Sequence, residues 1–317
     1  MKVLIYGLKN AGKTCLIQNV LAGKSWKDLE VVKPTEFIDS QEYVYRGLLK
    51  IDVFDCGGQE QFLKQYHEDE WKHNVFSNCS AFYFEIDSSN IVQLNNAKKE
   101  FYKAFTEIKK SSSEIQKVVV VISKCDVGKK PPKQIREFIF DHPDYDENVI
   151  DSISISIPKN TARKNFGKLL NNLIPDELKS KQQKLDNLCI EYNKKFKSIY
   201  SLILNKKDGL EIASATEKKL VSSNLKEEIE YTSLKVLLHS EEESKIFKLL
   251  KSNKLIYNNK MHFRTWETKD SEHIITLQDF SKNTGFFAIF KYNNFNYDRI
   301  RLSMDVLHGK INKIIYL

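Results

Sequence analysis

The 317-residue chain is poor in cysteine, proline and glycine, and it contains no long hydrophobic run. Its 5 cysteines are odd in number and scattered, which argues against a disulfide-stapled secreted domain and favours a reducing cytoplasm. No segment offers the ~18 consecutive apolar residues of a membrane-spanning helix. No signal-peptide pattern precedes the first predicted strand, so we expect a cytoplasmic protein.

The few prolines are unevenly placed and divide the chain. All 6 of them lie at or before Pro175. The length of 317 residues suits about two domains, each large enough for a hydrophobic core of its own. We therefore predict a first domain over residues 1–175 and a second domain over residues 176–317.

The formal net charge of +8 is not concentrated in one basic segment. Lysines alternate with glutamate and asparagine along the predicted helices, so we expect no nucleic-acid binding. Lys2 stands where N-myristoylation requires Gly, and the final residues Ile-Ile-Tyr-Leu do not form a prenylation motif. No direct membrane anchor is expected, and any recruitment to a membrane surface should come through a partner.

A short apolar run, Lys2 to Tyr6, leads directly into a phosphate-loop motif of the form G-x-x-x-x-G-K-T. Its glycines let successive backbone N–H groups converge on phosphate oxygens, and Lys13 adds a positive charge near the β and γ groups. Thr14 can offer its hydroxyl to Mg²⁺, and a helix from Cys15 to about Ala22 should direct its positive end at the anion. The predicted nucleotide contacts here are Gly7, Asn10, Ala11, Gly12, Lys13, Thr14 and Cys15.

A second apolar run, Leu48 to Phe54, ends in the sequence Asp-Cys-Gly-Gly-Gln-Glu, which begins at Asp55. A carboxylate at this place can hold a Mg²⁺-bound water, and Gly58 can bring its N–H against the γ-phosphate. Gln59 is the residue type that orients an attacking water. Upstream, Thr35 offers a hydroxyl for a second Mg²⁺ contact. Taken alone, the sequence that begins at Asp55 is also compatible with a solvent-facing turn.

A third apolar run, Val118 to Ile122, is unbroken, as expected for a strand buried on both faces of a parallel sheet. It ends in Ser-Lys-Cys-Asp, residues 123–126, which resembles the N-K-x-D guanine motif of GTPases. In that motif the Asp carboxylate accepts from guanine N1–H and the exocyclic amine, whereas adenine presents an acceptor at N1. The sequence therefore favours GTP over ATP, with Lys124 and Asp126 in contact with the base.

Two features around the guanine motif carry further expectations. Ser123 replaces the usual Asn and removes an amide that ties this loop to the phosphate loop, which predicts weaker base affinity. A strand-like segment, Ser152 to Ile157, follows, and the N–H groups of Ser156 and Ile157 are predicted to meet the guanine carbonyl oxygen.

With these motifs in place, the first domain resembles a small GTPase of the Ras superfamily, with a phosphate loop similar to the Arf branch. Three details favour the Rag/Gtr family: the non-Asn residue at Ser123, the pair Ser156-Ile157, and the segment Leu173-Ile174-Pro175. The chain also continues well past Pro175, where an Arf protein would stop. The resemblance implies a P-loop domain with a mostly parallel six-stranded sheet, followed by a roadblock-type (longin-like) dimerisation domain.

The pattern after Pro175 fits an α+β domain with a five-stranded antiparallel sheet and helices on its faces. A helix is predicted from Asp176 to about Phe196, then a hairpin of 199–205 and 210–215, three strands at 261–266, 273–278 and 285–292, and a last helix through Ile300 and Ile314. Between hairpin and strands, a helical region is predicted from eight apolar positions: Leu225, Ile229, Leu234, Leu237, Leu238, Ile246, Phe247 and Leu250.

The resemblance implies a GTP/GDP-controlled switch with Mg²⁺ held by Thr14, Thr35 and Asp55. Gln59 and Lys13 are the predicted catalytic residues of a GTPase whose intrinsic rate is slow, about 10⁻⁴ to 10⁻² s⁻¹. Expected partners are a related GTPase in a homo- or heterodimer, a GTPase-activating protein, and effectors. Two alternatives stay open: a nucleotide-locked scaffold or assembly module, and an Arf-like trafficking GTPase with an appended domain.

Overall fold

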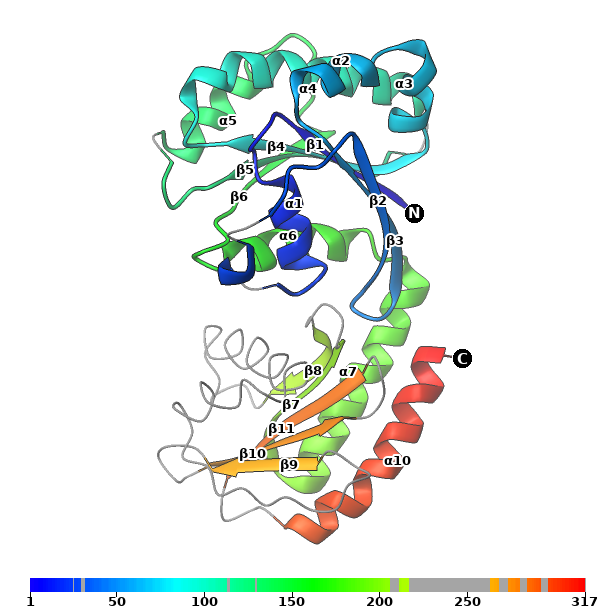
Figure 1. Ribbon diagram of the computed structural model, residues 1–317. Helices are drawn as coiled ribbons and strands as arrows, with labels where there is room; N and C mark the ends of the chain where they lie inside the picture. Colours follow the sequence, from blue (N-terminus) through cyan, green and yellow to red (C-terminus); the bar gives the residue numbers. More distant parts are fainter. Residues whose placement is uncertain are drawn as a thin grey trace. The chain divides into compact units, whose positions relative to one another are not determined.

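The computed structural model describes most of the chain in two units (Figure 1). The first unit comprises Met1–Val44 and Lys50–Ile174, and the second comprises Tyr45–Leu49 and Pro175–Leu317. The structure describes residues 1–24, 26–29, 32–112, 115–128, 130–205, 211–216, 263–267, 273–279, 284–291 and 296–316.

A six-stranded sheet forms the centre of the first unit, in the order β2-β3-β1-β4-β5-β6. Strand β1 is parallel to β3 and β4, β4 is parallel to β5, and β5 is parallel to β6. This arrangement confirms the predicted, mostly parallel six-stranded sheet. The strands are β1 (Lys2–Gly7), β2 (Ile38–Tyr45), β3 (Leu49–Cys56), β4 (Cys79–Asp87), β5 (Lys117–Ser123) and β6 (Ile150–Ser154).

Helices cover both faces of this sheet (Figure 1). One face carries α1 (Lys13–Val20) and α6 (Thr161–Asn172), which contact each other. The other face carries α2 (Glu60–Tyr66), α3 (Asp69–Phe76), α4 (Leu94–Ser111) and α5 (Pro132–Phe140). Two short 3₁₀ helices are formed by Trp26–Leu29 and Ile91–Gln93. Because parallel strands end at one edge, the loops that follow β1, β3, β4, β5 and β6 gather there.

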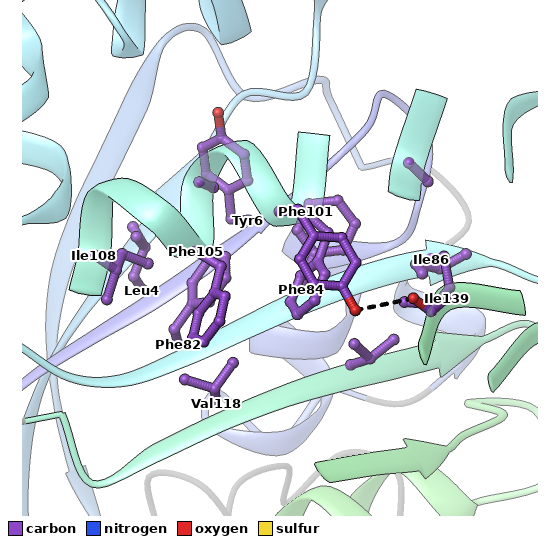
Figure 2. Close-up of a cluster of buried hydrophobic side chains, with 14 of the residues drawn as sticks. Leu4, Tyr6, Phe82, Phe84, Ile86, Phe101, Phe105, Ile108, Val118 and Ile139 are labelled. Carbon is purple, nitrogen blue, oxygen red and sulfur yellow. Dashed lines mark hydrogen bonds between the residues drawn. The ribbon is translucent and has the colours of Figure 1, made fainter. Parts of the chain in front are cut away.

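Aromatic side chains from β4 and α4 form the centre of one hydrophobic core (Figure 2). The fully buried ring of Phe101 stacks with Phe82 at 6.2 Å and with Phe105 at 6.0 Å between centroids, and meets Phe84 edge-on at 5.3 Å. Buried residues recur along α4 at steps of three and four, as expected for a helix with one face on a sheet. The Tyr102 hydroxyl donates to the Ile139 carbonyl at 3.0 Å and joins α4 to α5.

The second unit contains an antiparallel sheet in the order β8-β7-β11-β10-β9, with the helices α7 and α10. Its elements are α7 (Asp176–Phe196), β7 (Ser198–Asn205), β8 (Glu211–Thr216), β9 (Phe263–Glu267), β10 (His273–Asp279), β11 (Thr284–Lys291) and α10 (Tyr297–Tyr316). Leu185 and Tyr192 of α7 share a hydrophobic cluster with Ile300 and Met304 of α10. Among the described helices, none is both long and apolar enough to cross a membrane.

Most predicted elements are present, and the differences have local causes. Strand β6 ends at Ser154 rather than Ile157, because residues 157–160 turn into α6 and Pro158 cannot donate to a ladder. Helix α1 begins at Lys13 rather than Cys15, directly after Gly12 in the left-handed conformation. The predicted helical region from Leu225 to Leu250 lies outside the described residues.

Replacing the central core ring tests the packing of the first unit. We expect Phe101→Ala to lower the free energy of unfolding by about 3–5 kcal/mol, because it removes a fully buried ring and leaves a cavity. Val92→Ala, at a side chain that is 89% exposed, should change it by no more than about 0.5 kcal/mol. Urea unfolding of the full chain, followed by circular dichroism, measures both, and equal effects would contradict this account of the core.

Candidate functional site

A pocket of about 360 Å³ lies in the first unit at the edge where the parallel strands end. It brings together residues of three sequence motifs that are far apart along the chain. The residues that line it are Lys9, Asn10, Gly12, Lys13, Thr14, Cys15, Val32, Lys33, Pro34, Thr35, Cys56, Gly57, Gly58, Gln59 and Lys124. Of the other predicted site residues, Asp55 is the second-last residue of β3, while Asp126, Ser156 and Ile157 lie in the loops after β5 and β6.

The loop between β1 and α1 has a backbone that requires glycine at its ends. Gly7 has φ +145° and Gly12 has φ +119°, which L side chains rarely adopt, and Asn10 between them also has positive φ. A Cβ on Gly7 would lie 2.3 Å from the Glu85 carbonyl oxygen of β4. The Ala11 N–H donates to the Leu8 carbonyl at 3.3 Å and closes the turn. The glycines therefore set the course of the loop.

Lys13 is a buried cation that points back into this loop. Its Nζ donates to the Gly7 carbonyl at 2.9 Å and to the Leu8 carbonyl at 3.0 Å. Burial lowers the pKa of Lys13, while the nearby carboxyl groups of Asp55 and Glu85 act in the opposite direction. A buried cation of this kind is stabilised by an incoming anion, so the loop is suited to phosphate.

Three oxygen-bearing side chains from three segments converge beside Lys13. The Thr14 hydroxyl lies 2.6 Å from Asp55 Oδ2, the Thr35 hydroxyl lies 2.8 Å from the same atom, and the two hydroxyl oxygens are 2.8 Å apart. Burial raises the pKa of Asp55, and the two hydroxyl hydrogen bonds and Lys13 offset only part of that effect.

The same three side chains fit a magnesium ion. Asp55 Oδ1 is buried without a hydrogen-bond partner in the described part of the chain, so the carboxyl group retains an unused acceptor. Hydroxyl and carboxylate oxygens are the ligands that Mg²⁺ prefers. All three residues that the sequence assigned to the metal therefore lie together, although they are separated by 20 or more positions along the chain.

The segment after β3 lies directly against the phosphate loop. A Cβ on Gly58 would lie 2.3 Å from the Leu8 carbonyl carbon and 2.5 Å from the Lys9 nitrogen, so only glycine fits here. Gln59 lines the pocket and immediately precedes α2. The main-chain N–H of Gly57 donates to the Phe37 carbonyl at 2.6 Å.

The segment after β5 is tied to the phosphate loop, contrary to what the replacement of Asn predicts. The buried Ser123 hydroxyl donates to the Ala11 carbonyl at 2.6 Å, so a hydroxyl makes the connection for which the amide is missing. Lys124 Nζ adds a second link, at 2.7 Å from the Asn10 carbonyl and 2.7 Å from Asp87 Oδ2. The loss of the amide therefore does not separate the two loops, and the weaker base affinity expected from Ser123 stays a prediction.

Asp126 and the loop after β6 lie next to each other at the far end of the site. The Cys125 N–H donates to the Ile155 carbonyl at 3.1 Å and joins the two loops. Asp126 Oδ1 is buried and has no hydrogen-bond partner within the described ranges, which leaves it as an acceptor for a ligand. The Ser156 N–H already donates to Thr161 Oγ1 at 2.7 Å, so Ile157 is the better placed of the two predicted donors.

Comparison with known proteins agrees with this arrangement. A family model described as the Gtr1/RagA G protein conserved region matches residues 2–232. The chain belongs to this Gtr1/RagA family. Ras-related GTP-binding protein A of Dictyostelium discoideum is 26% identical over 197 residues, which cover 59% of this chain and 62% of that protein. ADP-ribosylation factor-like protein 2 of the same organism is 30% identical over 109 residues, 34% of this chain and 53% of that protein.

These alignments each span less than two thirds of the length of the relative. A solved structure of the Arl6 BBS3 small GTPase from Trypanosoma brucei is also similar, with a TM-score of 0.44 and 21% sequence identity over 54% of this chain and 96% of that chain. Membership of the Gtr1/RagA family confirms the resemblance inferred from the motifs.

Sequence reasoning missed two acidic residues of this Gtr1/RagA domain. Asp87 ends β4 and pairs with Lys124, and Glu85 lies fully buried below the phosphate loop. The signal for Glu85 is a single acidic residue inside the apolar run from Ala81 to Ile86. Such a residue stands out only when the run is known to be a buried strand.

The hydroxyl connection of Ser123 can be tested without a ligand. We expect Ser123→Ala to lower the free energy of unfolding by about 1–3 kcal/mol, because it leaves the Ala11 carbonyl without its buried donor. Ser180→Ala, at an exposed position of α7, is the control and should be nearly neutral. Urea unfolding measures both changes, and an unchanged Ser123→Ala protein would show that the hydroxyl does not hold the loop.

Proposed function

We propose that this chain is a GTP/GDP-controlled molecular switch that hydrolyses GTP slowly and signals through partners. The observation that carries the proposal is the convergence of the Thr14 and Thr35 hydroxyls on one carboxylate oxygen of Asp55, beside the buried ammonium of Lys13. A triphosphate supplies negative charge for the Lys13 ammonium, and its Mg²⁺ supplies a cation for the Asp55 carboxylate. Family membership supports the same reading.

Thr14, Thr35 and Asp55 would hold Mg²⁺, with Asp55 acting through a bound water. When bound, the ion neutralises the charge that develops on the phosphate oxygens. Lys13 adds a fixed positive charge at the same place, already oriented by the Gly7 and Leu8 carbonyls. Backbone N–H groups of residues 10–15 and of Gly58 complete the phosphate site.

Gln59 orients the attacking water in this proposal, since it lines the pocket beside Gly58. None of the residues that line the described pocket is an arginine that could stabilise the developing charge in cis. The intrinsic rate should therefore be slow, about 10⁻⁴ to 10⁻² s⁻¹, and a GTPase-activating protein should accelerate it.

Guanine recognition is assigned to the loops after β5 and β6. The unpartnered Oδ1 of Asp126 accepts from guanine N1–H and the exocyclic amine, and the stem of Lys124 packs on the ring. Adenine presents an acceptor at N1, so the same carboxylate would oppose it. The Ile157 N–H donates to the guanine carbonyl oxygen. The Ser156 N–H can do the same only if its hydrogen bond to Thr161 opens.

Two segments at the pocket can report the state of the bound nucleotide. Thr35 is joined to Asp55 by its hydroxyl, and the Tyr66 hydroxyl donates to the Phe37 carbonyl at 2.6 Å. Loss of the γ-phosphate would release Thr35 and Gly58, and Phe37 links that release to α2 through Tyr66. Effectors would read this difference.

The part of the chain from residue 176 to residue 317 is proposed to be a roadblock-type domain that pairs with a related GTPase. The order of its strands around an antiparallel sheet, with α7 and α10, supports this proposal. The match to the family model extends into this part, to residue 232. Recruitment to a membrane would then depend on a scaffold that binds the dimer.

Hydrolysis of loaded GTP tests the switch directly. We expect the parent protein, loaded with GTP and Mg²⁺, to convert bound GTP to GDP over hours, and Gln59→Leu to do so at least about tenfold more slowly, because it cannot orient water. Ion-exchange chromatography of the bound nucleotide measures both. Gln134→Leu, at an exposed position of α5, should behave as the parent.

If the parent and Gln59→Leu retain GTP equally for days, the chain is a nucleotide-locked scaffold. If neither protein binds GTP, the nucleotide site itself is wrong and the second domain becomes the place to look for function.

The base assignment has its own test. We expect Asp126→Ala to weaken GDP binding about 100-fold, because it removes a charged acceptor for two guanine donors. Asp151→Ala, at an exposed carboxylate of β6, should bind as the parent does. Titration with a fluorescent GDP analogue, with ATP as competitor, measures the loss. Equal affinity of both variants for GDP would show that Asp126 does not bind the base.

A further inference from the structure

The phosphate loop carries a charged side chain to which the proposed function gives no role. Between Gly7 and Gly12 the loop reads Leu-Lys-Asn-Ala, so Lys9 is its single charged residue. Lys9 is exposed and is one of the residues that line the pocket of about 360 Å³. A cation at the wall of a phosphate pocket can act on the ligand itself, so its position along the bound nucleotide decides what it does.

Lys9 lies at the end of the pocket where the proposed function places the γ-phosphate. Gly58 is the residue whose N–H would meet that phosphate, and a Cβ on Gly58 would lie 2.5 Å from the main-chain nitrogen of Lys9. Gln59, which would orient the attacking water, follows Gly58 and lines the same pocket. Guanine is assigned to the loops after β5 and β6, at the other end of the nucleotide. Lys9 therefore adjoins the last phosphate and not the base.

The Lys9 ammonium group is not engaged within the described part of the protein. Lys13 Nζ donates to two carbonyl groups of the loop, whereas Lys9 forms no side-chain hydrogen bond or ion pair with the described residues. Asp87 borders a small hollow together with Lys9, but its carboxylate pairs with Lys124 Nζ at 2.7 Å. The flexible four-carbon stem of a lysine lets its ammonium group move to where a ligand requires it. Lys9 can thus bind a phosphate without first breaking an internal contact.

The pocket as a whole favours added negative charge. The Asp55 carboxylate accepts from the hydroxyls of Thr14 and Thr35 and is assigned to Mg²⁺. GTP differs from GDP by the γ-phosphate alone, so a cation that reaches this group acts on one of the two nucleotides and not on the other. None of the described residues that line the pocket is acidic, and four of them are lysines: Lys9, Lys13, Lys33 and Lys124.

We propose that Lys9 is a specificity-determining residue, whose ammonium group binds the γ-phosphate and raises the affinity for GTP relative to GDP. This inference rests on the proposed nucleotide-binding function, and it means that Lys9 biases the switch toward its triphosphate form. An ion pair near solvent changes an equilibrium constant by up to about fivefold, and the phosphate charge of about −2 strengthens the pair. The expected contribution of Lys9 is therefore about fivefold to tenfold.

The test measures the affinities of the full-length protein for a fluorescent GDP analogue and for a fluorescent, non-hydrolysable GTP analogue, both with Mg²⁺. We expect Lys9→Gln to lower the ratio of GTP affinity to GDP affinity about fivefold to tenfold, because it leaves a polar side chain but removes the charge. Lys9→Arg retains the charge and should keep the ratio within about twofold of the parent. Lys103→Gln, at an exposed lysine of α4 outside the pocket, is the control and should match the parent.

Salt separates a direct contact with the γ-phosphate from a change in the shape of the loop. The Debye length falls from about 10 Å at 0.1 M salt to about 3 Å at 1 M. The difference between the parent and Lys9→Gln in the affinity ratio should therefore shrink to less than about threefold at 1 M salt. A loop deformed by the substitution would instead weaken the binding of both nucleotides, by an amount that salt does not change.

The outcomes distinguish this inference from the function on which it rests. An unchanged affinity ratio in Lys9→Gln, a difference that salt does not reduce, or an equal loss in Lys9→Arg would overturn the role of Lys9. In each of these cases the parent still binds GDP and GTP, so the proposed function stands. A parent that binds neither nucleotide would overturn the proposed function, and the role of Lys9 with it.

Discussion

The first unit is organised around one buried cation. Lys13 lies at the start of α1 with almost no exposure, and an isolated charge in such a place is unstable without partners. Its partners are the carbonyls of Gly7 and Leu8, in a loop where Gly7 and Gly12 have positive φ angles. The parallel sheet brings the strand ends to one edge, and the glycines and carboxyl groups at that edge compensate the charge of Lys13.

The same requirement connects segments that are distant in sequence. Asp55, near the end of β3, interacts with Lys13, and the hydroxyls of Thr14 and Thr35 hydrogen-bond to its carboxylate. Phe37 then joins Gly57 and Tyr66 through its carbonyl group. A change in charge at the phosphate site can thus reach α2 through a short series of hydrogen bonds, which is what the proposed switch needs.

The loop after β5 shows how a structure preserves a connection when a residue type changes. Ser123 is too short to act as an amide does, but its hydroxyl lies against Ala11 because β5 brings it directly below the phosphate loop. The Ser123 hydroxyl thus joins the two loops where the sequence indicates that the usual amide is missing.

The sequence by itself determined the type and order of the elements, because apolar periodicity is local. It predicted the strands β1, β3 and β5, the helix α7 from Asp176, and the hairpin of β7 and β8. It also identified the phosphate loop, since eight consecutive residues carry that motif. Element ends were less certain: β6 stops at Ser154, where a turn and Pro158 take over.

Only the tertiary structure decided which side chains meet. The distance from Thr35 to Asp55, the bond from Ser123 to Ala11, and the position of Glu85 below Gly12 all depend on the pairing of strands that are distant in sequence. Sheet register sets these contacts, and it is fixed by packing across the whole core rather than by any local pattern. The motifs therefore identified the residues of a nucleotide site, while the fold determined which side chains contact them.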